Sequence, residues 1–277
     1  MTSRQFSTRS GARVTMAVLA AAALAAAAGC SSSSNSTGAA SSSSSTSASA
    51  SSTVSGAVTV FAASSLKAAF TTLGAQFHTA NPGATVTFNF GGSATLAQQI
   101  TAGAPADVFA AASSATMKTV TTASDAVGTP SVFAHNQLEI AVAPGNPKNI
   151  TSLSDLTKSG LKVVLCAVAQ PCGAAAATVV KDAKVSLTPV SLEADVASAL
   201  TKVELGEADA ALVYKTDVQG SGGKVTGVDF PESSDAINTY PIAVLTHAPN
   251  SAAATAFVAY VLSAQGQAVL AQDGFAK

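Results

Sequence analysis

The stretch AVTVFAASSLKAAFTTLGAQFHTANPGATVTFNFGGSATL at 57–96 carries the pattern that decides the fold. Apolar residues at 58, 60 and 61 predict a buried strand, and apolar residues at helical spacing from Leu66 to Phe77 predict a helix directly after it. The pattern then repeats: Pro82-Gly83 turns the chain, 86–90 alternates as a strand, and a second helix opens at Ser93. Each strand therefore runs into a helix that starts at a serine.

These two helix starts are candidate anion sites. Ser64 and Ser65 stand at the first start and Ser93 at the second. The first turn of a helix carries unpaired backbone N–H groups and partial positive charge, and a serine hydroxyl adds another donor, so a small anion fits there. The alternative is that the serines only cap their helices, because serine is a preferred capping residue. The local pattern alone leaves both interpretations open.

The rest of the chain continues to alternate strands and helices, which predicts an α/β fold with mostly parallel sheets. Further strands are expected at 138–143, 161–165, 187–190, 208–214, 225–230 and 240–245. In such sheets ligands bind beyond the carboxyl ends of the strands, where the polar loops collect. Asp107, at the start of a buried strand, is expected to accept hydrogen bonds from loop amides, and a cation or a sugar is its alternative partner.

The first 55 residues differ in composition from the rest. Arg4, Arg9 and Arg13 precede an apolar run at 14–28, and Ala-Ala-Gly-Cys ends this segment at Cys30. The pattern predicts a lipoprotein signal peptide at 1–29, cleaved before a lipidated Cys30, with an uncleaved N-terminal anchor as the alternative. Residues 30–55 are nearly all Ser, Thr and Ala, which predicts a disordered tether that holds the folded part outside the cytoplasm.

Charge limits the chemistry of the folded part. The chain's three arginines all precede Cys30, so the remainder has 11 lysines, 15 acidic residues and a net charge of −4. An arginine clamp on a carboxylate or phosphate is therefore excluded, and the acidic balance argues against nucleic-acid binding. His78, His135 and His247 stand in no hydrolase motif, which argues against an exported hydrolase, and we expect them at the surface or in loops.

Two cysteines remain in the folded part. Cys166 and Cys172 are six residues apart, and thiols outside the cytoplasm tend to pair. We expect a disulfide between them. A metal site is the alternative, but two cysteines without a nearby histidine offer too few ligands.

Five segments resemble the molybdate-binding proteins of ABC importers. They are TVFAASSL at 59–66, GSATLAQQITAGAPADVF at 92–109, ADV at 194–196, ALVY at 211–214 and YPIAV at 240–244. The resemblance implies a two-domain type II periplasmic-binding-protein fold, α/β with mixed, mostly parallel sheets and two interdomain crossovers, in which an oxyanion lies between the domains. Residues 56–137 with 240–277 would form domain 1, and 138–239 would form domain 2.

The resemblance also implies a set of ligand-binding residues. The oxyanion would be held by the hydroxyls of Ser65, Ser93 and Tyr214 and by the backbone N–H groups of Cys172 and Val196. Ser64 takes a position that is usually alanine and is an extra candidate donor, and Cys172 also replaces an expected alanine. Considered alone, Tyr214 would be a core tyrosine. Neutral donors would disfavour protonated phosphate, because its proton would face other donors.

The expected function is capture of molybdate, and of tungstate, by a lipid-anchored extracytoplasmic receptor. The receptor would be a monomer, would deliver the anion to an ABC permease and its ATPase, and would catalyse no reaction and need no cofactor. Sulfate or another tetrahedral oxyanion is the alternative ligand, since it differs from molybdate chiefly in size, which the sequence does not measure. A structural or adhesive lipoprotein is the alternative outside binding proteins, and it would need neither Ser65 nor Ser93.

Overall fold

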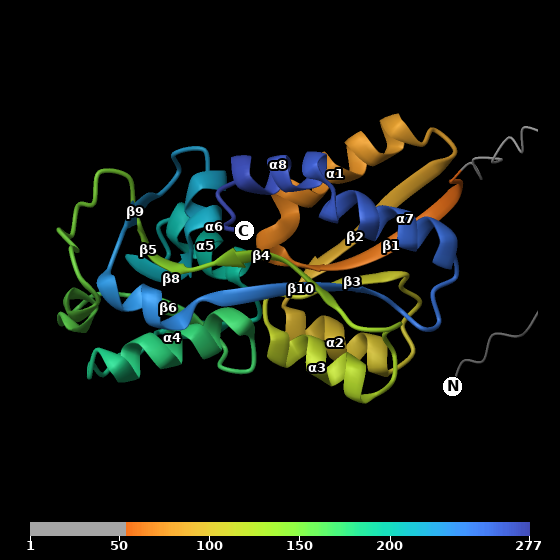
Figure 1. Ribbon diagram of the computed structural model, residues 1–277. Helices are drawn as coiled ribbons and strands as arrows, with labels where there is room; N and C mark the ends of the chain where they lie inside the picture. The colour runs from red at the N-terminus through yellow and green to blue at the C-terminus, as the bar shows by residue number, and fades with distance from the viewer. Residues whose placement is uncertain (1–53) are drawn as a thin grey trace, which may run out of the picture. The chain divides into compact units, whose positions relative to one another are not determined.

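The computed structural model describes residues 54–277, and the expected signal peptide, Cys30 and nearly all of the tether lie outside these described residues. The described chain forms two five-stranded sheets, and helices pack against each of them (Figure 1). We call each sheet together with its helices a lobe.

The first lobe has the strand order β2-β1-β3-β10-β4. Its strands are β1 (Gly56–Ala63), β2 (Ala84–Gly91), β3 (Val108–Ala110), β4 (Ser131–Asn136) and β10 (Asn238–Val244). Its helices are the 3-10 turn η1 (Ser64–Leu66), α1 (Lys67–Ala80), α2 (Ser93–Thr101), α3 (Ser114–Thr122), α7 (Ser251–Leu262) and α8 (Ala264–Gln272). Helices α1, α7 and α8 lie on one side of this sheet, and α2 and α3 lie on the other (Figure 1).

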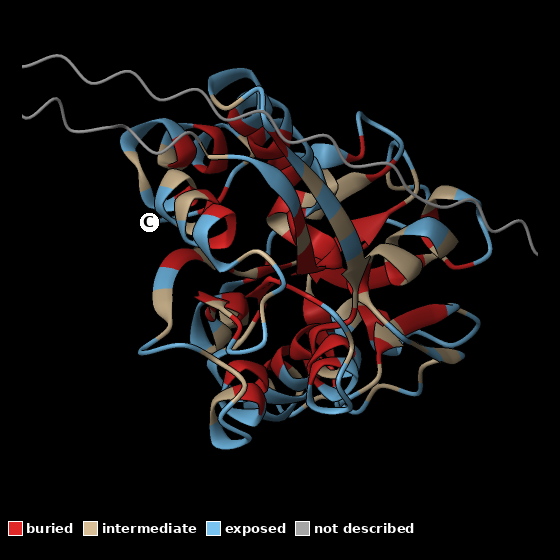
Figure 2. Cartoon of the chain, turned by 90° about the vertical axis from the view of Figure 1, so that its right-hand side faces the viewer, coloured by how far each residue is buried: buried red, intermediate tan, exposed pale blue. Residues whose placement is uncertain are grey.

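The side chains of β1 explain why both faces of the first sheet are covered. Val58 and Val60 pack in one buried cluster with Phe70 of α1 and Phe257 of α7. Phe61 points to the opposite face and packs in a second cluster, which contains Leu96 of α2, because successive side chains of a strand alternate between faces. Buried residues accordingly run along the strands, while the outer helix faces are exposed (Figure 2).

The second lobe has the strand order β7-β6-β8-β5-β9. Its strands are β5 (Leu138–Val142), β6 (Val163–Cys166), β7 (Ser191–Glu193), β8 (Ala210–Tyr214) and β9 (Thr226–Val228). Its helices are η2 (Leu153–Thr157), α4 (Pro171–Asp182), α5 (Val196–Glu204), α6 (Lys215–Gly220) and η3 (Pro231–Ala236). A single buried apolar cluster, centred on β5, β6 and β8, holds this lobe together.

The strand pairings confirm the mixed α/β fold. In the first sheet β1 is parallel to β2 and β3, and β10 is antiparallel to β3 and β4. In the second sheet β6 is parallel to β7 and β8, and β5 is antiparallel to β8 and β9. Parallel pairs are thus half of the pairings rather than most of them. The chain crosses between the lobes after β4 and returns before β10, which gives the two expected crossovers.

Some local predictions differ from the structure. The strand expected at 187–190 is wrong, since β7 follows at Ser191–Glu193, and β4 was not predicted at all. Asp107 accepts hydrogen bonds from the backbone N–H groups of Thr59 and Asn250, both at 2.7 Å. Asn250 lies in the loop before α7, as the loop-amide interpretation predicts, but Thr59 lies in β1. His78 and His247 are exposed as expected, but His135 lies half-buried in β4. Among residues 54–277, only α7 and α8 taken together across a 60° bend have enough length and apolar character to cross a membrane, and no single helix does.

Candidate functional site

A small cavity lies between the two lobes, at the carboxyl ends of their strands. Its walls come from the segments that follow β1, β2 and β3 in the first lobe and β6, β7 and β8 in the second. Its lining residues are Ala63, Ser64, Ser65, Gly91, Gly92, Ala112, Gln170, Pro171, Cys172, Asp195, Val196 and Tyr214. Four of the five residues proposed from the sequence as ligands are among them, and the fifth, Ser93, is not. The cavity volume of about 10 Å³ is room for about one water molecule.

Ser65 contributes its hydroxyl from η1, where β1 ends. Its Oγ lies 2.9 Å from the hydroxyl of Tyr240, in a buried hydrogen bond in which either oxygen can donate. Burial raises the pKa of Tyr240, so this phenol stays protonated. Ser64, beside it, also lines the cavity and has 9% of its surface exposed. The bond to Tyr240 fixes the position of the Ser65 hydroxyl before any ligand arrives.

Ser93 begins α2, and its hydroxyl is almost fully buried. Its Oγ accepts a hydrogen bond of 3.0 Å from the backbone N–H of Ala112, and Ala112 itself lines the cavity. A hydroxyl that accepts one bond still has a proton to donate. Asn238, at the return crossover, donates to the Ala112 carbonyl at 2.8 Å, so the segment facing Ser93 is held on both sides.

Cys172 and Val196 present backbone N–H groups at two helix starts of the second lobe. Val196 is the first residue of α5, and Cys172 is the second residue of α4, after Pro171. The N–H groups of a first helical turn have no acceptor within the helix. Pro171 suits the start of α4 because its missing N–H would have been unpaired there. Both helices therefore direct free donor capacity and partial positive charge at the cavity.

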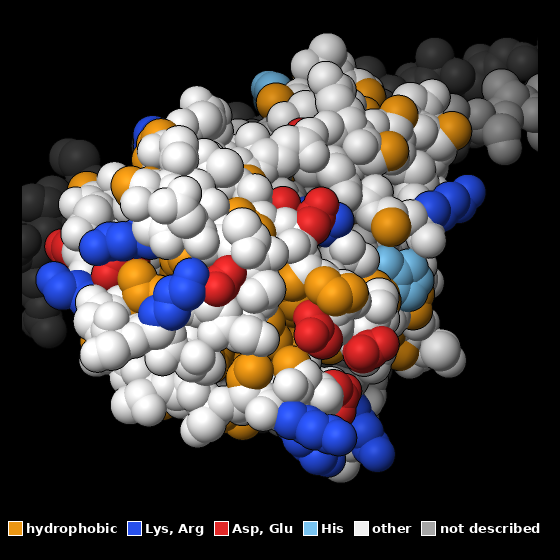
Figure 3. All heavy atoms as spheres, turned by 90° about the vertical axis from the view of Figure 1, so that its left-hand side faces the viewer, with side chains coloured by type: hydrophobic (Ala, Val, Ile, Leu, Met, Phe, Trp, Pro, Cys, Tyr) orange, Lys and Arg blue, Asp and Glu red, His pale blue; other side chains and the backbone are white. Residues whose placement is uncertain are grey.

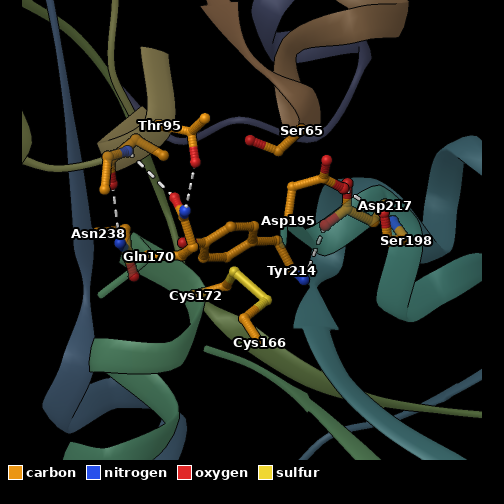
Figure 4. The surroundings of a disulfide bond; sticks show 12 residues. Ser65, Thr95, Cys166, Gln170, Cys172, Asp195, Ser198, Tyr214, Asp217 and Asn238 are labelled. Atoms are coloured by element: carbon orange, nitrogen blue, oxygen red, sulfur yellow. Dashed lines mark hydrogen bonds between the residues drawn. A yellow bond between two sulfur atoms is a disulfide. The ribbon is translucent and has the colours of Figure 1, made fainter. Parts of the chain in front are cut away.

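The structure joins Cys166 and Cys172 in a disulfide with an S–S distance of 2.06 Å, beside the cavity (Figure 4). The bond ties the end of β6 to the start of α4. The enclosed loop is compact: a Cβ added at Gly173 would lie 2.1 Å from the carbonyl oxygen of Ala167. The disulfide and this close backbone approach together limit where the Cys172 N–H can point.

Tyr214 ends β8 and is 1% exposed. Its ring packs edge-on against Tyr240 at 6.1 Å between centroids. Its hydroxyl is buried and has no hydrogen-bond partner among the described residues. Burial raises the pKa of this phenol well above 10, so it remains a donor. A buried donor without an acceptor is unfavourable, and an anion in the cavity would supply the acceptor.

Two carboxyl groups lie near these donors (Figure 4). Asp195 lines the cavity and caps α5 by accepting from the Ser198 N–H at 2.8 Å. Asp217 accepts from the Tyr214 N–H at 2.9 Å, and burial raises the pKa of its carboxyl to about 7, with the charge of Asp195 adding to the rise. The lining contains no lysine or arginine. The attraction of the neutral donors for an anion would therefore have to exceed the repulsion from the Asp195 carboxylate, which is the acidic side chain of the lining.

Gln170 and Tyr240 are the site residues that sequence reasoning missed as participants. Gln170 precedes α4, lines the cavity and is 6% exposed. Tyr240 supports Ser65 from β10, 175 residues further along the chain. The only sequence feature that pointed to Gln170 was its position at a helix start. Tyr240 is part of the YPIAV motif at 240–244, but no function was assigned to it from the sequence. Among the described residues, no group of three or more His, Cys, Asp or Glu side chains could hold a metal ion.

Comparisons with known proteins agree with this fold. Residues 58–276 match the family model described as bacterial extracellular solute-binding protein. The molybdate-binding protein ModA of Mycobacterium bovis is 48% identical over 221 residues, 80% of this chain and 85% of that protein. ModA of Haemophilus influenzae is 32% identical over 233 residues, 80% of this chain and 90% of that protein. The periplasmic molybdate-binding protein of Azotobacter vinelandii superposes with a TM-score of 0.69 at 18% identity, covering 79% of this chain and 99% of that one.

The chain therefore belongs to the bacterial extracellular solute-binding proteins, a class that binds its solute rather than transforming it. Within that class it is similar to the molybdate-binding proteins named ModA, and the resemblance stated from the sequence motifs is confirmed.

Proposed function

We propose that this protein captures molybdate in the cavity between its lobes and delivers it to an ABC importer. The observation that carries the proposal is the convergence of Ser65, Cys172, Val196 and Tyr214, from both lobes, on one cavity without a cationic side chain. Hydrogen bonds to a charged group contribute about 1.5–3 kcal/mol each. A set of five such bonds, with Ser93 as the fifth donor, is enough for tight binding of a dianion.

Closure of the lobes around the anion is the mechanism that fits this cavity. A volume of about 10 Å³ is smaller than a tetrahedral oxyanion requires, so the lobes must separate to admit it and then close on it. A ligand that contacts both lobes binds the closed state better and shifts the population toward it. Residues 56–137 with 240–277, and 138–239, are the two bodies that we propose to move.

Neutral donors also select among oxyanions. Molybdate, tungstate and sulfate are unprotonated dianions near neutral pH and can accept a hydrogen bond on every oxygen. Protonated phosphate must also donate, and in this site its proton would face donors. We therefore propose molybdate and tungstate as ligands. Sulfate is the alternative that the measurement below tests.

The N-terminal segment completes the proposal. Cleavage of a signal peptide at 1–29 and lipidation of Cys30 would leave the binding domain tethered to the outer face of the cell membrane as a monomer. There it would meet the permease of its importer, which works with an ATPase. The face of the second lobe drawn in Figure 3 carries acidic side chains as well as lysines. Nucleic-acid binding typically uses a basic patch, so the proposal includes no nucleic-acid partner.

Isothermal titration calorimetry tests the ligand assignment. The sample is the compact part that the structure describes, residues 54–277, titrated in turn with molybdate, tungstate, sulfate and phosphate. We expect one-to-one binding of molybdate and tungstate, and weak or absent binding of sulfate and phosphate. Ser65→Ala combined with Ser93→Ala should weaken molybdate binding by a factor of about 150 or more, since two charge-assisted donors are lost. Sulfate binding as tight as molybdate would move the function to sulfate uptake, and no heat with any oxyanion would refute the receptor.

A further inference from the structure

Gln170 forms a two-point bridge between the lobes. It belongs to the second lobe, where it directly precedes α4. Its Oε1 accepts a hydrogen bond from the backbone N–H of Ala94 at 3.1 Å, and its Nε2 donates to Thr95 Oγ1 at 3.0 Å (Figure 4). Both partners lie in the first turn of α2, in the first lobe. One side chain therefore uses its acceptor and its donor on the opposite lobe at the same time.

The bridge supplies a cap that α2 lacks locally. The residue before α2 is Gly92, which has no side chain to cap the helix. The N–H of Ala94 is one of the first-turn donors without an intrahelical acceptor. Gln170, 76 residues further along the chain, provides that acceptor. A primary amide suits this role because it offers one acceptor oxygen and an adjacent NH₂ donor.

The contact lies where three helix starts meet. A Cβ added at Gly92 would lie 2.5 Å from Gln170 Oε1 and 2.3 Å from the carbonyl oxygen of Ala194. Gly92 leads into α2, Gln170 leads into α4, and Ala194 precedes the cap of α5. These are the helices that carry Ser93, Cys172 and Val196. The bridge therefore sets the spacing between the donors of the first lobe and those of the second.

We infer that Gln170 is a positioning residue that latches the closed form: its hydrogen bonds to Ala94 and Thr95 hold the α2 and α4 starts together and slow the release of the bound oxyanion. The inference rests on the proposed function. The bridge requires the two lobes to be in contact, so it cannot form while the site is open to ligand. Its loss should therefore raise the dissociation rate without slowing association.

Thr95 offers a matched pair of variants. Its side chain is exposed and belongs to no buried cluster, so Thr95→Val removes the acceptor for Gln170 without disturbing the core. Thr95→Ser keeps the hydroxyl and loses only a methyl group. One neutral hydrogen bond corresponds to a factor of about 5, and two to a factor of about 30. We expect molybdate release about 5-fold faster in Thr95→Val, about 30-fold faster in Gln170→Leu, and at the wild-type rate in Thr95→Ser.

The measurement is the release of radiolabelled molybdate from the loaded protein into excess unlabelled molybdate, with association followed by stopped-flow tyrosine fluorescence. Wild-type release rates in Thr95→Val and Gln170→Leu would overturn the inference that Gln170 latches the closed form. Equal increases in the release rate in Thr95→Val and Thr95→Ser would also overturn it. If the wild-type protein retains no molybdate, the proposed function fails by itself. The latch is then decided by small-angle scattering of the unliganded proteins: a larger radius of gyration in Gln170→Leu than in wild type supports it, and equal radii refute it.

Discussion

Gly92→Ala is expected to block closure of the lobes without damaging either lobe. The backbone of Gly92 has φ −65° and ψ 128°, which any residue adopts, so alanine introduces no backbone strain. The new methyl would lie 2.3 Å from the Ala194 carbonyl oxygen and 2.5 Å from Gln170 Oε1. Both atoms belong to the second lobe. The clash therefore exists only when the lobes are together, and opening relieves it.

The size of the effect follows from the cost of overpacking. Inserting a methyl group into a close contact costs about 1–3 kcal/mol. Here that cost falls on the closed state alone, and the apparent affinity of a ligand that needs the closed state drops by the same amount. The dissociation constant for molybdate should rise by a factor of about 5 to 150. The free energy of unfolding of the ligand-free protein should change little, since the open form accommodates the methyl.

Gly220→Ala is the matched control for Gly92→Ala. Gly220 ends α6 outside the cavity lining, has no positive φ, and a Cβ added there would meet no atom within 4 Å. Calorimetric titration with molybdate and urea unfolding without it are measured for both variants. We expect weakened binding in Gly92→Ala and not in Gly220→Ala, with similar free energies of unfolding for both variants. Wild-type affinity in Gly92→Ala would show that the close approach of Gly92 to Ala194 is not required for binding, and the closure mechanism would be wrong.

Three further predictions follow from individual groups of the site. Tyr214→Phe removes a donor that has no partner among the described residues in the closed form, so it should weaken molybdate binding about 10-fold or more without lowering the free energy of unfolding of the ligand-free protein. Calorimetry and urea unfolding measure the two effects, and a loss of ligand-free stability would contradict the role of the hydroxyl. Reduction of the Cys166–Cys172 disulfide, which closes a loop with a separation of 6, should lower the free energy of unfolding by about 2 kcal/mol and the melting temperature by about 4–8 °C; a Cys166→Ala, Cys172→Ala variant should not respond to the reductant. Burial raises the pKa of Asp217 from 3.8 to about 7, so the folded state favours the protonated acid. The stability contributed by this group is full below pH 3.8 and is lost as the pH rises toward 7. The difference in unfolding free energy between Asp217→Asn and wild type should therefore grow from pH 4 to 7 and then level off, and a constant difference would refute the assigned pKa.

The sequence predicted the local parts of the site because each depends on a few adjacent residues. Ser65 and Ser93 were placed at helix starts by the apolar spacing that follows them; Ser65 is the second residue of η1, and α2 begins at Ser93. Strand β4 was missed because its strand character depends on pairing with β10, about a hundred residues later. The same limit applies to the direction of the Ser93 hydroxyl, which the Ala112 N–H sets from a separate loop. Spacing along the chain does not measure such pairings.

The charge balance of the site explains why anion binding depends jointly on Gln170, Tyr214 and the helix starts. With no arginine after Cys30 and no lysine in the cavity lining, an anion there must be held by neutral groups. Neutral donors are short-range, so they act only if their positions are fixed. Ser65 is fixed by Tyr240 and the α4 start by the disulfide before binding, and α2 is fixed by Gln170 once the lobes close. A cationic clamp would attract the anion from a distance and tolerate an open cleft. A site of fixed dipoles instead makes binding depend on closure, and for that reason the contacts between the lobes matter as much as the ligand contacts themselves.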